Sequence, residues 1–123
     1  MKTILTAVAA SLIAFSADAA DRPEWVGYWA ANAAWCENAG KVGEETPDQY
    51  VETGIFGLEW SCSLTSVVPT GVGKSWAVKM QCLDAGDAYD DASIFMLTQY
   101  DRLLVISSYG ETSNLVRCAK KPE

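Results

Sequence analysis

The sequence predicts an all-β protein: a small antiparallel meander barrel of about seven to eight strands, carrying two disulfides. Three observations favour this fold class. Apolar and polar residues alternate with period two from Val51 onward, and no helical period is sustained. Turn-forming clusters separate the alternating runs at spacings of roughly ten residues, as in antiparallel meanders. The cysteines are four, an even number, in a chain that begins like an exported protein.

Residues 1–19 read as a cleaved secretory signal peptide. Lys2 precedes the apolar segment ILTAVAASLIAF, and Ala17 and Ala19 occupy the small-residue positions of a cleavage site. The segment is shorter than the ~20 residues that a membrane-spanning helix needs, so a retained anchor is the disfavoured alternative. We therefore expect a single β-barrel domain over residues 20–123, periplasmic or secreted, with no transmembrane segment.

The expected domain begins with WVGYW, near the first strand, followed by AANAAWCENAG. The alanines of this second segment favour a short helical turn that ends at Gly40. The cluster ENAGKVGEETPD then predicts a loop.

Four further runs predict strands: EWSCSLTSVV, KSWAVKMQC, SIFMLTQY and LLVISS. The alternation is cleanest in the second run, where Trp76, Val78, Met80 and Cys82 share one face. The clusters PTGVGK, DAGDAYDD, YDR and YGETSN predict the turns that follow these runs.

The last expected hairpin is the candidate contact region. RLLVI leads up to it, YGETSN turns with permissive residues Gly110 and Asn114, and LVRC returns. A hairpin tip held in this way is rigid and exposed, which suits a loop that enters a cleft in another protein at little ordering cost. The alternative is a turn with a structural role alone. The candidate partner-binding residues are Ser107, Ser108, Tyr109 and Glu111.

The four cysteines allow three pairings. We expect sequential pairing, Cys36–Cys62 and Cys82–Cys118, in which each bridge closes a loop of a few tens of residues. In the chain-entropy model each such bridge contributes on the order of 3 to 4 kcal/mol. Zinc binding by the cysteines is disfavoured, because the chain has no His and no C-x-x-C.

The net charge is −7, and it stays −7 when removal of the signal takes away Lys2 and Asp18, one charge of each sign. An acidic surface repels phosphate backbones, so nucleic acid is not an expected partner. A basic protein would be attracted at long range. The charge also has a simpler interpretation, solubility alone.

Several motifs suggest chemistry that their contexts do not support. GKS at Gly73–Ser75 lacks the upstream glycine of a phosphate-binding loop. The cluster Asp84, Asp87, Asp90 and Asp91 lacks the spacing of a calcium loop and predicts a solvated hairpin tip. Without His, the usual general base is missing, and the cysteines are expected in disulfides. We expect no catalytic residues, no cofactor, no metal and no enzyme activity.

The Gly-x-Trp arrangement of Gly27 and Trp29, together with Arg117 near the end of the chain, resembles the calycin group of barrels. In the lipocalins of that group, the tryptophan of the first strand lies across the barrel floor and an arginine of the closing strand packs over it. The resemblance implies the same cation–π contact here, worth about 1 kcal/mol.

The whole profile resembles bacterial periplasmic inhibitors of c-type lysozyme: a signal, a small disulfide-bonded β domain and a polar Ser/Tyr loop. Those proteins are eight-stranded barrels that insert a loop with Ser and Tyr into the lysozyme cleft, where the hydroxyls hydrogen-bond the catalytic carboxylates. The resemblance implies that Ser107, Ser108 and Tyr109 are the corresponding loop, although the family writes Ser-Gly and then Tyr two residues later. The acidic charge suits a basic lysozyme.

The leading hypothesis is therefore a periplasmic inhibitor of c-type lysozyme. Two alternatives stay open. A calycin-like ligand-binding barrel would have an apolar cavity that opens at one end, and a cell-envelope structural or interaction protein would not bind lysozyme saturably.

Overall fold

The structure is a computed structural model that describes residues 22–122 as eight strands and one short 3-10 helix. Their bounds are β1 (Gly27–Ala30), η2 (Ala33–Asn38), β2 (Asp48–Val51), β3 (Gly54–Phe56), β4 (Trp60–Pro69), β5 (Lys74–Asp84), β6 (Asp87–Leu97), β7 (Arg102–Ser107) and β8 (Thr112–Arg117). The predicted signal peptide, residues 1–19, lies outside the described residues.

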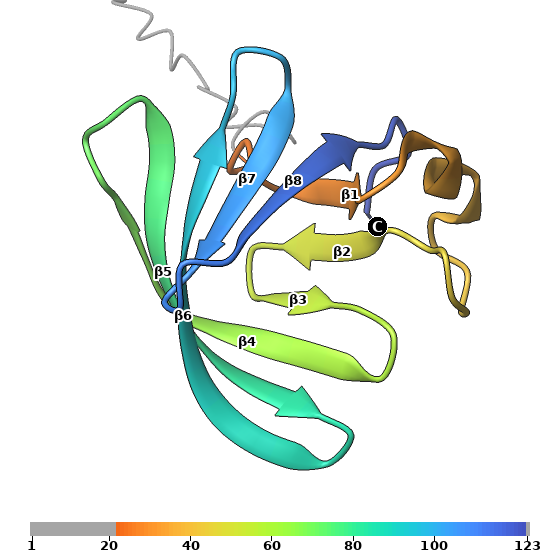
Figure 1. The fold of residues 1–123 in the computed structure, drawn as a ribbon, viewed down its shortest axis with the longest axis horizontal. Helices are drawn as coiled ribbons and strands as arrows, with labels where there is room; N and C mark the ends of the chain where they lie inside the picture. Colours follow the sequence, from red (N-terminus) through yellow and green to blue (C-terminus); the bar gives the residue numbers. More distant parts are fainter. Residues whose placement is uncertain (1–21, 123) are drawn as a thin grey trace, which may run out of the picture.

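The strands form one closed antiparallel barrel in chain order (Figure 1). Strand β1 closes it against β8 over two residue pairs, Trp29 with Arg117 and Ala30 with Val116. The predicted fold class, a small antiparallel meander barrel of about seven to eight strands with two disulfides, is confirmed, and the strands number eight. Of the residues described, no helix has the length and apolar character needed to cross a membrane.

The inner face of the barrel is filled by side chains from every strand. In β5 the alternation predicted for Trp76, Val78, Met80 and Cys82 is present: the last three are buried, and Trp76 packs against them half-buried. Phe95 of β6 lies opposite Trp76 and is completely buried. The aliphatic and aromatic side chains therefore form one continuous core, as a strand with one buried face requires.

Strands β5 and β6 are longer than the sequence predicts. They pair over eleven positions, from Lys74 opposite Leu97 to Asp84 opposite Asp87, and Figure 1 shows their hairpin extending away from the short strands β1 to β3. The prediction that DAGDAYDD is a turn throughout is wrong, because only Ala85 and Gly86 turn. Residues 87–91 are strand because β5 supplies their ladder partners, and this pairing overrides the weak strand preference of Asp.

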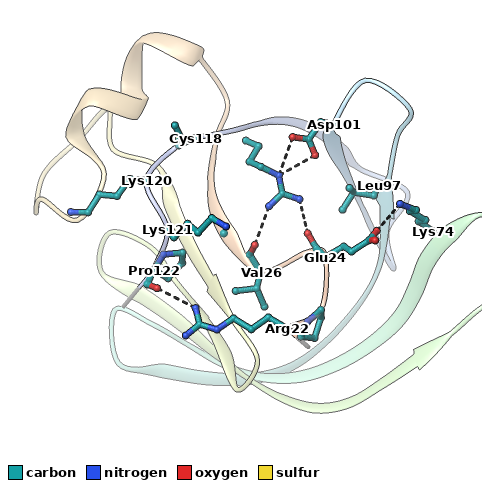
Figure 2. Close-up of a pocket in the computed structure, with 14 residues that line it drawn as sticks. Arg22, Glu24, Val26, Lys74, Leu97, Asp101, Cys118, Lys120, Lys121 and Pro122 are labelled. Atoms are coloured by element: carbon teal, nitrogen blue, oxygen red, sulfur yellow. Dashed lines mark hydrogen bonds and ion pairs between the residues drawn. The ribbon is translucent and has the colours of Figure 1, made fainter. Parts of the chain in front are cut away.

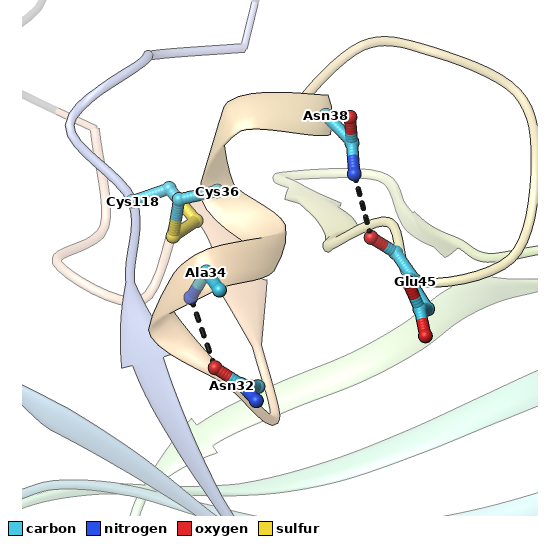
Figure 3. Close-up of a disulfide and its surroundings, with 6 residues drawn as sticks. All are labelled: Asn32, Ala34, Cys36, Asn38, Glu45 and Cys118. Carbon is cyan, nitrogen blue, oxygen red and sulfur yellow. Dashed lines mark hydrogen bonds between the residues drawn. A yellow bond between two sulfur atoms is a disulfide. The ribbon is translucent and has the colours of Figure 1, made fainter.

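The predicted disulfide pairing is also wrong. The bridges join Cys36 to Cys118 and Cys62 to Cys82, not Cys36 to Cys62 and Cys82 to Cys118. Cys62 in β4 lies directly opposite Cys82 in β5, and both point into the core. Cys36 on η2 lies beside Cys118, the residue after β8 (Figure 3). Each cysteine therefore bonds its spatial neighbour in the barrel, and sequence order does not decide the pairing.

The helical turn predicted in AANAAWCENAG is confirmed as η2. Asn32 caps its start, since its side-chain Oδ1 accepts a hydrogen bond from the backbone N–H of Ala34 at 2.9 Å (Figure 3). A second contact fixes the segment after the helix: the Asn38 side chain donates to the carbonyl of Glu45 at 3.1 Å. The helix thus carries Cys36 at a defined place over the end of the barrel.

The cation–π contact expected between Arg117 and Trp29 is present. The Arg117 guanidinium lies 4.3 Å from the centre of the Trp29 ring, and Trp29 is completely buried. The same guanidinium donates hydrogen bonds to the carbonyls of Glu24 at 2.6 Å and Val26 at 3.1 Å, and its Nε contacts the Asp101 carboxylate (Figure 2). Arg117 therefore fixes the segment that enters β1 to the strand that closes the barrel.

Candidate functional site

The β7–β8 loop is the connection that follows Ser107, the last residue of β7. Three of the four predicted contact residues, Ser108, Tyr109 and Glu111, are exposed there, and Tyr109 has 87% of its surface accessible. Gly110 has φ +85°, a left-handed conformation that glycine adopts without strain. A hairpin is present here with its tip directed to solvent, but the predicted turn YGETSN is too long. Thr112, Ser113 and Asn114 are part of β8, and Asn114 pairs with Leu104 of β7 instead of turning.

Ser107 differs from the other three candidates because its hydroxyl is used inside the loop. Its Oγ accepts hydrogen bonds from the backbone N–H groups of Tyr109, at 3.2 Å, and Glu111, at 3.1 Å. Its backbone N–H donates to the Glu111 carbonyl at 2.8 Å, and its carbonyl accepts from Gly110 at 3.0 Å. Ser107 therefore holds the loop in shape, while Ser108, Tyr109 and Glu111 are left for contact.

The loop is also tied to the neighbouring strand. The backbone N–H of Ser108 donates to the carbonyl of Ala92 in β6 at 3.0 Å. The next residue back, Asp91, uses its carboxylate to accept from the N–H of Ala92 at 2.8 Å. The β7–β8 loop is therefore joined to the part of β6 that carries the exposed Asp90 and the half-buried Asp91.

A hollow of about 400 Å³ opens on the outer face of the barrel beside Ser108. Its floor is a row of apolar side chains in direct cross-strand register: Val68, Ala77, Ile94 and Ile106, from β4 to β7. Val68 is 54% exposed and Ile94 39% exposed. Exposed apolar residues in one contiguous patch are typical of a protein contact surface.

Sequence reasoning did not find this hollow. The signal was present in the apolar pair Val67 and Val68, which face opposite sides of β4, and in Ile94, which faces away from Phe95. Joining Val68, Ala77, Ile94 and Ile106 into one row needs the register of four strands, and local patterning does not contain that register.

The acidic residues Asp84, Asp87, Asp90 and Asp91 lie along the β5–β6 hairpin, and none of them is buried. Within residues 22–122 no group of three or more potential metal ligands comes together. Elsewhere, burial raises the pKa of Asp48 in β2 to about 6. Burial and, secondarily, the Asp48 carboxylate raise the pKa of the core residue Tyr50.

None of the four candidate partner-binding residues belongs to the buried cluster inside the barrel. Eleven buried residues form its main cluster, among them Phe95, whose ring contacts the rings of Trp25 and Tyr50. The four cysteines expected in disulfides are all bonded and therefore supply no thiol.

Comparison of the chain with protein-family models, with curated proteins and with solved structures finds no significant match.

Proposed function

We propose that this protein is a periplasmic or secreted protein-binding barrel that inhibits a c-type lysozyme by inserting its β7–β8 loop into the active cleft of the enzyme. The observation that carries the proposal is the loop itself. Its backbone is fixed by the Ser107 hydroxyl and by Ala92, and it presents Tyr109 almost fully exposed at the tip. A contact loop that is ordered before binding loses little conformational entropy when it binds.

The chemistry of the loop suits a cleft that contains carboxylic acids. Glycosidases of this kind act with a pair of carboxyl groups. The hydroxyls of Ser108 and Tyr109 can donate hydrogen bonds to such groups, and hydrogen bonds to charged acceptors are about twice as strong as neutral ones. Ser107 keeps the backbone geometry that presents these two hydroxyls.

Two further features support a basic protein as the partner. The net charge of −7 favours encounter with a protein of opposite charge, and Glu111, Asp90 and Asp91 place negative charge beside the loop. The apolar row from Val68 to Ile106 extends the contact surface next to Ser108. The packed interior disfavours the alternative of a ligand carried inside the barrel.

The test is lysis of bacterial cell walls by a c-type lysozyme with and without the oxidised protein, residues 20–123, at two salt concentrations. We expect stoichiometric inhibition that weakens as salt rises, because screening reduces the attraction between opposite charges. No inhibition at a large molar excess of the protein would refute the proposal.

A double substitution assigns the inhibition to the loop. Ser108→Ala with Tyr109→Phe removes both hydroxyls, and we expect the inhibition constant to rise about tenfold or more, since each hydrogen bond to a charged group contributes about 1.5–3 kcal/mol. Tyr100→Phe is the matched control, because Tyr100 is 78% exposed in the turn at the other end of β7. Equal inhibition by the double variant and the wild type would remove these hydroxyls from the mechanism.

A further inference from the structure

A second hollow, of about 450 Å³, lies at the end of the barrel where the chain enters β1 (Figure 2). Its walls come from the segment before β1, the turn before β7 and the residues after β8. Five of the nine Lys and Arg residues of the chain line it: Arg22, Lys74, Arg117, Lys120 and Lys121. The positive charges of a strongly acidic protein are thus concentrated at one place.

The acidic residues of the hollow neutralise only part of this charge. Among the described residues of the lining, Glu24 and Asp101 are the carboxylates, so five positive and two negative side chains leave a net of +3 there. Glu24 pairs with Lys74 at 2.9 Å, and Asp101 pairs with Arg117 at 3.0 Å. Among residues 22–122, no salt bridge neutralises Arg22, Lys120 or Lys121.

The three remaining cations are not equivalent. Lys120 extends away from the centre of the hollow in Figure 2, where its Nζ donates to the Ala39 carbonyl at 3.2 Å. Arg22 donates through Nη1 to the Pro122 carbonyl at 3.3 Å, which leaves its other N–H groups available. Lys121 also lines the hollow, next to Pro122, the residue whose carbonyl accepts from Arg22. Arg22 and Lys121 are therefore the cations in position to meet a ligand.

The rest of the lining is largely apolar. Pro23, Val26 and Leu97 form part of the wall, and Ala119 and Pro122 complete it. A volume of about 450 Å³ lies within the range of about 300–1,000 Å³ that is usual for small-molecule sites. Such sites combine apolar walls with a few polar groups that orient the ligand.

We propose that this hollow binds a small amphipathic anion, a carboxylate or phosphate group joined to an apolar body. The anionic group lies between Arg22 and Lys121, and the apolar body lies against Val26 and Leu97. Arg117 acts as a positioning residue, because its hydrogen bonds to the carbonyls of Glu24 and Val26 hold one wall of the hollow in place. This site is separate from the β7–β8 loop and does not rest on the proposed lysozyme inhibition.

The test is an NMR titration of the oxidised protein, residues 20–123, with octyl phosphate and with octanoate below their micelle concentrations. We expect saturable shifts of the backbone amides of Leu97, Ala119 and Lys121. Inorganic phosphate, which lacks the apolar body, and octyl glucoside, which lacks the charge, should each bind about tenfold more weakly or worse. Equal binding of either of these two probes would overturn the proposal.

A pair of double variants with the same change in net charge separates a site from general attraction. Arg22→Gln with Lys121→Gln should weaken binding about tenfold, since both direct contacts to the anion are lost. Lys41→Gln with Lys79→Gln removes two exposed lysines elsewhere and should change it less than twofold. Equal weakening by the two variants would refute a localised site.

Vesicles that contain phosphatidylglycerol distinguish a soluble ligand from a membrane surface. We expect the soluble probes to bind and the vesicles to show no binding that depends on Arg22 and Lys121, because an acidic protein is repelled by an anionic surface. Vesicle binding that Arg22→Gln with Lys121→Gln abolishes, without binding of either soluble probe, would overturn the proposal and identify the hollow as a membrane contact.

Discussion

Arg117 connects parts of the chain that lie more than ninety residues apart. Its guanidinium stacks on Trp29, donates to two carbonyls of the segment before β1 and pairs with Asp101 (Figure 2). Only two residue pairs join β1 to β8, so this side chain supplies a large part of the closure of the barrel. The contact with Trp29 was predictable from the sequence through the calycin resemblance, whereas the carbonyl contacts were not, because no side-chain pattern marks a backbone acceptor.

Replacing Arg117 with Met should lower the free energy of unfolding by about 2–3 kcal/mol, because two part-buried or exposed carbonyls lose a charged donor and Trp29 loses its cation–π contact. Urea unfolding followed by tryptophan fluorescence measures the loss. Arg102→Met is the control: Arg102 is exposed and contacts Asn114 at 3.4 Å, and we expect a change below about 0.5 kcal/mol. Equal effects of the two substitutions would show that Arg117 contributes nothing beyond a surface charge.

Asp48 is a carboxylic acid whose ionisation opposes folding in the range between pH 4 and pH 7.5. Burial raises its pKa from 3.8 to about 6, so the folded protein binds more protons than the unfolded chain between these pH values. Stability from this residue is therefore fully present below about pH 4 and is lost as the pH rises through 6.

Asp48→Asn removes this cost and should raise the free energy of unfolding by about 3 kcal/mol at pH 7.5 relative to the wild type. The advantage should be small at pH 4 and disappear below about pH 3, where Asp48 is protonated in both states. Urea unfolding at five pH values between 4 and 7.5 measures the difference. Gln49→Ala, a neutral change at the next residue, should shift stability equally at every pH, and a pH-independent effect of Asp48→Asn would contradict a raised pKa.

At the scale of single elements, the β7–β8 loop shows how one side chain orders a hairpin tip. Ser107 accepts from two backbone N–H groups of the loop, so the backbone at Tyr109 and Glu111 depends on its hydroxyl. The sequence predicted the hairpin but made its turn too long, because Thr112 to Asn114 pair with β7. It did not separate Ser107, which organises the loop, from Ser108, because both appear as exposed serines in a turn.

Ser107→Ala should speed amide hydrogen exchange at Tyr109 and Glu111 about tenfold or more, because both N–H groups lose their acceptor. Ser107→Thr keeps the hydroxyl and should restore slow exchange. NMR-detected exchange measures both variants. Slow exchange in Ser107→Ala would show that the remaining backbone hydrogen bonds suffice to order the loop.

Strand boundaries were predicted well where apolar and polar residues alternate strongly. They were predicted poorly where a strand forms only because a neighbouring strand pairs with it. β5 follows its pattern from Trp76 to Cys82, and β7 follows LLVIS. By contrast, Asp87–Asp91 reads as a turn, and becomes strand only because β5 continues beside it. Strand β3, with three residues, is too short for a period to be visible.

At the scale of the whole molecule, the disulfides show which long-range facts the sequence contained and which it did not. Cys62 and Cys82 lie ten residues on either side of Val72, in the turn that joins β4 to β5, so a hairpin with this turn brings them close, and the register shift between Leu64 and Ser66 puts them directly opposite each other. That signal was available. The pairing of Cys36 with Cys118 is different, because it follows from closure of the barrel between β1 and β8, which no local pattern states.

Loss of the Cys36–Cys118 bridge should cost more than loss of the Cys62–Cys82 bridge. Their sequence separations are 82 and 20, and the chain-entropy model gives about 4.5 and about 3 kcal/mol for loops of these lengths. Paired Cys→Ala variants compared by urea unfolding test the order. Peptide mapping of the unreduced protein tests the pairing directly, and a peptide that joins Cys36 to Cys62 would show that the connectivity is different.

The Cys36–Cys118 bridge also determines what happens to the protein when a protease cuts the chain. Every strand from β2 to β8 lies between its two cysteines, so a single cut in any of their loops leaves both fragments covalently joined. A cut in the exposed turn at Gly71–Gly73 is bridged twice, since it also falls between Cys62 and Cys82. The nicked chain stays one covalent molecule, and its two pieces separate only after reduction.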